Sequence, residues 1–248
     1  MEKNTILIIE DEMSLMETLK LKLSKAGLNV EAEMDGAKAL DRIKEIKPDL
    51  ILLDLVLPNV SGEEILEKIK KDENLKQTPV IIISNSGQPV EIKKLLALGA
   101  DDYIIKADFT IDDILERIYN VLESRASQPD VLIAEDEPSL RAVLVKKLRL
   151  KNVKAITALD GDVALKNILE FKPKVVILDL LMPGLSGIEI LEALKKNPAF
   201  DKKGSKILIL SNYSGKEKEP LIKEMTQGYY IKANLDIDDV VEKIKGLL

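Results

Sequence analysis

The chain alternates short apolar runs with longer segments in which apolar residues recur at helical spacing. In the first half, runs rich in Ile, Val and Leu predict strands near residues 5–10, 28–33, 49–54, 79–84 and 102–105. The intervening amphipathic pattern predicts helices near residues 14–26, 36–46, 61–72, 89–98 and 110–123. Strands that are apolar along their whole length are buried on both faces, so this alternation predicts a parallel sheet covered by helices on both sides.

The second half of the chain repeats the first. Residues 51–67 read ILLDLVLPNVSGEEILE and residues 176–192 read VILDLLMPGLSGIEILE, with ten identities in seventeen positions at an offset of 125. A period this long indicates two whole domains, because solenoid repeats have periods of about 20 to 50 residues. We therefore predict two doubly wound, five-stranded α/β domains in tandem, over residues 1–124 and 130–248, joined by a polar linker over 125–129.

The amino-acid composition excludes several kinds of catalytic and metal-binding site. The 248 residues include neither His nor Cys, which excludes disulfides, thiolate zinc sites, imidazole bases and Ser-His-Asp triads. A net charge of −6 with no Trp argues against a nucleic-acid surface. The first residues do not resemble a signal peptide, and no apolar run approaches the roughly 18 residues of a membrane span. We expect a cytoplasmic protein that binds neither membrane nor nucleic acid.

Polar side chains follow the apolar strands at matching positions in both halves. Each half has an acidic pair after its first strand, an Asp after its third, a Ser after its fourth and a Lys after its fifth. These residues are Glu10, Asp11, Asp54, Ser84 and Lys106 in the first half and Glu135, Asp136, Asp179, Ser211 and Lys232 in the second. Because the carboxyl ends of parallel strands share one edge of a sheet, we expect each set to converge there.

This set of groups suits one kind of chemistry. Clustered carboxylates are ligands that Mg²⁺ prefers, and the cation balances their mutual repulsion. The lysine supplies a second positive charge and the serine a hydrogen-bond donor. An aspartate nucleophile held among such groups can accept a phosphoryl group, because metal and lysine stabilise the charge that develops on it. A single strand-end Asp is more often a turn or cap residue, but the ordered set occurs twice.

At these residues the chain resembles the receiver domain of bacterial two-component response regulators, whose fold is flavodoxin-like. The motifs D-x-x-L-P-x-x-S-G from Asp54 and D-x-x-M-P-x-x-S-G from Asp179 are similar to the phosphoacceptor loop of that family. The resemblance covers nearly the whole chain, twice. It implies the strand order 2-1-3-4-5 in each domain, which the handedness and pattern of the elements alone do not give.

The resemblance also implies a role for each residue. The phosphoacceptors would be Asp54 and Asp179, and the Mg²⁺ ligands would be these two together with Asp11 and Asp136, and with Glu10 and Glu135 acting through water. Ser84 and Ser211 would hydrogen-bond the phosphoryl group, and Lys106 and Lys232 would pair with it. The rotating aromatic residues of the switch would be Tyr103 and Tyr229.

The chain departs from the family pattern at the residues that follow the lysine and the serine of each half. The family lysine normally precedes a proline, often across a cis bond, but Ala107 and Ala233 follow it here, so we expect a trans or a strained bond. The family prefers a small residue after the hydroxyl, and both halves have Asn, at 85 and 212. Tyr213 occupies the next position in the second half, and we expect it to shield the phosphoryl group from water.

The resemblance points to a signalling phosphoacceptor rather than an enzyme. Without histidine the chain cannot supply its own phosphohistidine, so the phosphoryl group is expected in trans from a histidine kinase or a histidine phosphotransfer protein. We expect output through contacts with a downstream protein. Asp101, Asp102 and Arg117 resemble the charged positions through which many receivers form dimers, so we expect any homodimer to form through the first domain.

Two alternatives remain at this stage. Aspartate-nucleophile phosphatases share a related fold, but they normally carry a second Asp two residues after the nucleophile, where this chain has Val56 and Leu181. The other alternative is a scaffold in which one or both receivers are not phosphorylated. Neither half lacks a side chain that phosphorylation requires. A receiver that is not phosphorylated would therefore have to owe this to the Asn residues at 85 and 212 or to the Ala residues at 107 and 233.

Overall fold

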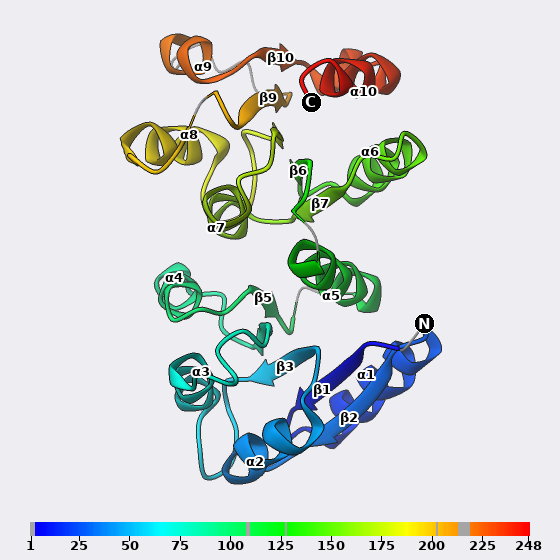
Figure 1. Cartoon of the computed structure of the whole chain (residues 1–248), viewed down its shortest axis with the longest axis vertical. Helices are drawn as coiled ribbons and strands as arrows, with labels where there is room; N and C mark the ends of the chain where they lie inside the picture. The colour runs from blue at the N-terminus through cyan, green and yellow to red at the C-terminus, as the bar shows by residue number, and fades with distance from the viewer. Residues whose placement is uncertain (1–2, 108–109, 127, 202, 213–218) are drawn as a thin grey trace. The chain divides into compact units, whose positions relative to one another are not determined.

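The computed structural model describes residues 3–107, 110–126, 128–201, 203–212 and 219–248. Helices and strands alternate along the chain, which divides into two compact units, Met1–Leu122 and Glu123–Leu248. Each unit is built on its own five-stranded parallel sheet (Figure 1). Ser127, which falls in the predicted linker, and Tyr213 both lie outside the described residues.

In the first unit the elements follow the predicted ranges closely. The strands are β1 (Thr5–Ile9), β2 (Asn29–Glu33), β3 (Leu50–Asp54), β4 (Val80–Ser84) and β5 (Asp102–Ile105). The helices are α1 (Met13–Lys25), α2 (Gly36–Ile46), α3 (Gly62–Lys71), α4 (Pro89–Ala97) and α5 (Ile111–Ala126). The sheet order is β2-β1-β3-β4-β5, which confirms the order that the resemblance implied.

The second unit has the same succession of elements. The strands are β6 (Val131–Ala134), β7 (Ala155–Ala158), β8 (Val175–Leu178), β9 (Lys206–Leu210) and β10 (Gly228–Tyr230). The helices are α6 (Pro138–Leu150), α7 (Gly161–Phe171), α8 (Gly187–Lys196), α9 (Glu219–Met225), the 3-10 turn η2 (Lys232–Asn234) and α10 (Ile237–Lys245). Its sheet order, β7-β6-β8-β9-β10, matches that of the first unit.

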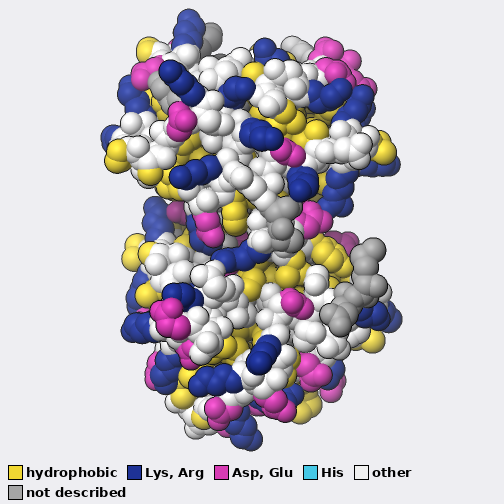
Figure 2. Space-filling model, in the orientation of Figure 1, with side chains coloured by type: hydrophobic (Ala, Val, Ile, Leu, Met, Phe, Trp, Pro, Cys, Tyr) yellow, Lys and Arg dark blue, Asp and Glu magenta, His cyan; other side chains and the backbone are white. Residues whose placement is uncertain are grey.

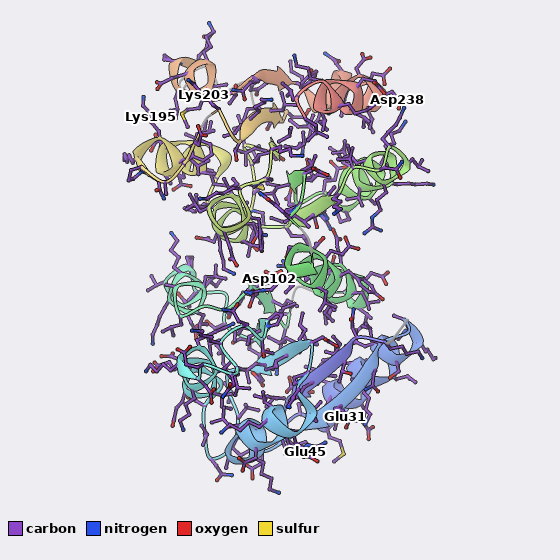
Figure 3. The ribbon with its side chains drawn as sticks, viewed as in Figure 1. Glu31, Glu45, Asp102, Lys195, Lys203 and Asp238 are labelled. Carbon is purple, nitrogen blue, oxygen red and sulfur yellow. The ribbon has the colours of Figure 1, made fainter. Side chains whose placement is uncertain are left out.

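Each sheet is covered on both faces. In the first unit, side chains that alternate along the strands pack on one side against α2, α3 and α4, and on the other side against α1 and α5. In the second unit, α6 and α10 cover one face together. Lys147 on α6 forms an ion pair of 2.5 Å with Asp238 on α10, and of these two residues only Asp238 is labelled in Figure 3. The polar side chains predicted for the site therefore lie where the buried strands end.

On the face shown in Figure 2, acidic and basic side chains are interspersed over both units, and neither charge gathers in one patch. Much of this charge is paired locally, as in Arg42, whose guanidinium lies 2.7 Å from Glu45 and 3.4 Å from Glu31, both labelled in Figure 3. In the part of the chain that the structure describes, we find no helix with the length and apolar character needed to cross a membrane.

Candidate phosphoacceptor sites

The residues predicted for the site converge at the carboxyl ends of the strands in both units. Asp54 and Ser84 are the last residues of β3 and β4, and their side chains are buried. Asp179 and Ser211 directly follow β8 and β9 and are buried as well. The acidic pairs follow the interior strands β1 and β6, and the two lysines follow the edge strands β5 and β10.

The acidic side chains lie close enough to share one cation. In the first unit, Glu10, Asp11 and Asp54 each offer an oxygen, and these atoms all lie within 4.8 Å of one another. Glu135, Asp136 and Asp179 form the same arrangement in the second unit. In each trio the second residue is exposed and the other two are buried, so the cluster opens to solvent on one side.

A lysine ammonium group bridges two of the carboxylates in each unit. Lys106 Nζ lies 2.7 Å from Asp54 Oδ2 and 2.9 Å from Glu10 Oε1. Lys232 Nζ lies 2.6 Å from both Asp179 Oδ2 and Glu135 Oε1. Burial alone would lower the pKa of each lysine, but the hydrogen bonds to the two carboxylates outweigh burial and raise it. Both lysines therefore stay charged at neutral pH.

For the two glutamates, burial has a larger effect on the pKa than the hydrogen bond from the lysine. Burial raises the pKa of the Glu10 carboxyl above its ordinary value, the hydrogen bond from Lys106 lowers it, and the charge of Asp54 adds to the increase. The pKa of Glu135 is raised mainly by burial, against the hydrogen bond from Lys232. These carboxylates need further positive charge, because one ammonium group does not compensate two buried anions and the exposed Asp beside them.

One buried oxygen marks where that charge fits. Among the described residues, Glu135 Oε2 is buried and has no hydrogen-bond partner. A buried, unpartnered carboxylate oxygen is costly unless a cation or a bound water satisfies it. The donor set is all oxygen, with carboxylates as ligands, which fits Mg²⁺ and does not fit metals that prefer nitrogen or sulfur. The residues present therefore fit the cation that the sequence predicted.

The loop after each phosphoacceptor candidate fixes its other oxygen. Val56 N donates to Asp54 Oδ1 at 3.2 Å, and Leu181 N donates to Asp179 Oδ1 at 3.1 Å. The motif glycine lets the following helix start directly against this loop. A Cβ at Gly62 would lie 2.0 Å from the carbonyl oxygen of Asp54, a separation that no side chain could adopt.

Ser84 and Tyr103 lie on neighbouring strands beside the first site. Ser84 Oγ accepts a hydrogen bond of 3.1 Å from Ser86 N. The Tyr103 ring is 4% exposed, and its hydroxyl donates to the carbonyl oxygen of Ser86. Burial raises the pKa of that hydroxyl. Tyr103 thus ties β5 to the loop after β4, and Tyr229 occupies the matching position on β10, paired in register with Ile209 of β9.

The residues after the two lysines have a regular backbone. No described peptide bond is cis, so both Lys-Ala bonds are trans, the first of the two geometries expected. In the second unit, Ala233 N donates to Asn212 Oδ1 at 2.9 Å, a bond that a proline at 233 could not make. In the second unit, the two residues that depart from the family pattern, Ala233 and Asn212, are therefore hydrogen-bonded to each other. Among the described residues of the first unit, Asn85 and Ala107 make no such bond.

One contact of the second site was not predicted from the sequence. Arg141 on α6 is 1% exposed, and its guanidinium donates to the carbonyl oxygens of Glu135 and Asp136. The signal was present in its position, because Arg141 precedes the buried Leu144 and Leu148 by three and seven residues and so lies on the same helix face. The site predicted from the sequence did not include Arg141, which the structure buries beside it.

The charged residues predicted for a dimer surface have partners inside their own unit. Asp101 Oδ2 accepts from Val80 N at 2.9 Å, and Gln227 of the second unit accepts from Ile207 N in the same way, so this position supports a strand. Asp102, labelled in Figure 3 at the start of β5, forms a buried ion pair with Arg117. These contacts account for the residues without a second copy of the chain.

Comparison with known proteins decides the family. A model of the response regulator receiver domain matches residues 6–119 and again residues 131–245. The chain belongs to the response regulator receiver family. Its two receiver domains form a tandem, as the internal repeat predicted.

Curated relatives of these receiver domains include a response regulator. ArlR, a response regulator of Staphylococcus aureus, is 41% identical over 127 residues, which are 51% of this chain and 56% of ArlR. The chain thus spans about half the length of the curated relatives it matches. Solved structures include the Francisella response regulator 1452 receiver domain, at 30% identity with a TM-score of 0.47, covering 50% of this chain and all of that one. The BeF3-activated receiver domain of Klebsiella pneumoniae RstA is 28% identical with a TM-score of 0.45, covering 48% and 98%.

Proposed function

We propose that this protein is a cytoplasmic, tandem-receiver phosphoacceptor in which Asp54 and Asp179 each accept a phosphoryl group. Its two domains would span residues 1–124 and 130–248, joined by 125–129. The observation that carries the proposal is the lysine-bridged acidic cluster, which occurs twice with nearly equal distances. Membership of the receiver family supports it.

The transfer follows from what each side chain can do. A carboxylate oxygen of Asp54 attacks phosphorus of a phosphohistidine, a P–O bond forms, the P–N bond breaks, and the imidazole leaves with the electron pair. Lys106 holds the aspartate in place before the reaction and then pairs with a phosphoryl oxygen, while Ser84 donates a hydrogen bond to another. In the second domain Asp179, Lys232 and Ser211 take these roles.

The proposed cation is Mg²⁺, held by Asp11 and Asp54 in the first domain and by Asp136 and Asp179 in the second, with Glu10 and Glu135 acting through water. When bound, it would supply positive charge that neutralises the charge spread over the oxygens of the phosphoryl group during transfer. The unpartnered Glu135 Oε2 is the feature of this chain that supports a bound cation or water at that place.

The proposed donor is a histidine kinase or a phosphotransfer protein acting in trans, and the proposed output is an altered contact with a downstream protein. The chain contains no histidine to act as its own donor. A homodimer through the first domain remains part of the proposal, although Asp102 and Arg117 would have to exchange their internal ion pair for a contact across it. Sedimentation of the chain after phosphorylation tests this, and a monomer at all concentrations would count against it.

The chemical nature of the modification tests the proposed function. The chain is incubated with acetyl phosphate and Mg²⁺, and the product is treated with neutral hydroxylamine. An acyl phosphate on aspartate is cleaved by hydroxylamine, whereas phosphate esters of Ser, Thr and Tyr resist it. We expect all added phosphate to be lost. A hydroxylamine-resistant modification would contradict the proposal.

A further inference from the structure

Arg141 is a buried cation that donates to two backbone carbonyl groups. Its Nη1 donates to the carbonyl oxygen of Glu135 at 3.0 Å and to that of Asp136 at 2.9 Å. A guanidinium group taken out of water is costly unless hydrogen bonds compensate it, so the retention of one inside this domain needs a reason. Its contacts are with the two residues whose carboxylates begin the second acidic cluster.

The bonds from Arg141 fix the backbone of the loop at residues 135–136, and further hydrogen bonds fix the side chain of Glu135. Glu135 Oε1 accepts from Glu137 N at 3.1 Å and from Lys232 Nζ at 2.6 Å, so the carboxylate and the carbonyl of one residue are both fixed. Helix α6 begins immediately afterwards at Pro138, which has a restricted backbone. The backbone that carries the two acidic side chains is therefore constrained without any bound cation.

Among the described residues of the first domain, no side chain provides this constraint. Met16 of α1 occupies the position of Arg141, at the same offset of 125 that relates the acidic pairs. Its thioether packs against the core beside Leu19 and Leu23 and has no hydrogen to donate. The first acidic loop has a bond from Glu12 N to Glu10 Oε1, at 3.2 Å, but no counterpart of the guanidinium. The two domains thus provide a natural comparison.

We propose that Arg141 is a positioning residue for the cation site of the second receiver domain, an inference that rests on the proposed function. By fixing the carbonyls of Glu135 and Asp136, it holds the acidic side chains near their ligand positions before a cation arrives. Binding then requires less ordering of the loop, and preorganisation of this kind increases affinity. Partners that orient metal ligands affect affinity by about 10- to 100-fold in other sites.

The guanidinium also brings positive charge toward the site, which opposes cation binding. Its charge is delocalised over the planar group, and its Nη1 donates to two neutral carbonyl oxygens, while the three carboxylates of the cluster lie together at the site itself. The proposal therefore requires that ordering outweighs repulsion. The two effects change Mg²⁺ affinity in opposite directions when Arg141 is removed, so one titration separates them.

The test is a Mg²⁺ titration of the full ¹⁵N-labelled chain, with the amides of residues 135–137 reporting on the second site and those of residues 10–12 on the first. In Arg141→Met we expect the dissociation constant of the second site to rise about tenfold and that of the first to stay unchanged. Arg141→Lys keeps the charge and one donor group, so we expect a smaller rise. Without Mg²⁺, the Glu137 amide should exchange its hydrogen faster in Arg141→Met than in wild type.

A control separates positioning from general stability. Leu144→Val reduces core packing on the same helix and leaves the bonds of Arg141 intact, so it should lower stability without changing Mg²⁺ affinity. An unchanged or tighter dissociation constant in Arg141→Met would overturn the inference while leaving the proposed function in place. If neither site of the wild-type chain bound Mg²⁺, both the inference and the proposed cation would be overturned.

Discussion

At the scale of single residues, each site depends on an ammonium group placed between two carboxylates. The side chain of Lys106 is 9% exposed, and those of Glu10 and Asp54 are 1% and 4% exposed. In this setting the ion pairs are poorly screened, and loss of the lysine leaves two buried anions without compensation. The ammonium group to which we assign a role in phosphoryl transfer is therefore also needed for the stability of the site without a cation.

Replacement of that lysine tests this coupling. We expect Lys106→Met to lower the free energy of unfolding of the first domain by about 3 kcal/mol at pH 7 without divalent cations, because uncompensated buried charge is destabilising. Added Mg²⁺ should restore part of the loss by binding the native state. Urea unfolding with and without Mg²⁺ measures both effects.

Lys71→Met is the matched control. Lys71 pairs with Glu67 at 2.9 Å on the surface of α3, and its side chain is 76% exposed, so its removal should change stability by less than about 0.5 kcal/mol. A loss in Lys106→Met as small as that in the control would show that the buried ion pairs do not have the assigned role.

Asp130 provides a pH-dependent contribution at the opposite end of the second sheet. Burial acts to raise the pKa of its carboxyl, but hydrogen bonds from Lys174 Nζ and Lys154 N outweigh burial and lower it. A lowered native-state pKa stabilises the fold above the unfolded-state value of about 3.9, and this contribution is lost as pH falls through the native value.

We therefore expect Asp130→Asn to lower the stability of the second domain by about 1 kcal/mol at pH 7, and the difference from wild type to shrink below about pH 4. Urea unfolding between pH 3 and 7, followed through amide signals of that domain, measures it. Lys174→Met should have a similar effect, and the double variant should be little worse than either single one. A difference that persisted undiminished at pH 3 would refute this account.

At the scale of elements, the pattern of apolar residues predicted the bounds of the strands well, but it did not predict the contacts between loops. The strands of the first unit begin and end within about one residue of the predicted ranges because their apolar runs stop where polar side chains reach the sheet edge. Helix α5 continues to Ala126, because Ser124 and Arg125 give no signal that ends a helix. The bond from Ala233 to Asn212 joins two loops, and no periodic pattern encodes such a contact.

This loop contact differs between the two domains and can be tested in one experiment. In Asn212→Ala we expect the Ala233 amide to lose hydrogen-exchange protection and the second domain to lose about 0.5 to 1.5 kcal/mol of stability, the usual net contribution of one hydrogen bond. Asn212→Asp keeps an acceptor and should retain protection.

Asn85→Ala provides the comparison in the first domain. Since Asn85 makes no such bond among the described residues, the exchange of the Ala107 amide should not change. Equal effects of the two alanine substitutions on the following loops would mean that the bond in the second domain does not restrain its loop.

At the scale of the whole molecule, the chain duplicates one domain and changes its details. The repeat, the absence of histidine and the strand-end polar residues were all visible in the sequence, and they were sufficient for the domain count and the candidate acidic sites. The order of the strands came from the resemblance, because pattern alone does not specify which strands are neighbours. The burial of Arg141 and of the Asp102–Arg117 ion pair depends on tertiary packing, and the sequence suggested surface positions for Asp102 and Arg117.

The central claim is that both domains accept phosphoryl groups, on Asp54 and Asp179. The most direct test is the intact mass of the chain after incubation with acetyl phosphate and Mg²⁺, compared among wild type, Asp54→Ala, Asp179→Ala and the double variant. We predict two added phosphates in wild type, one in each single variant and none in the double variant. Two phosphates in either single variant, or none in wild type, would contradict the account.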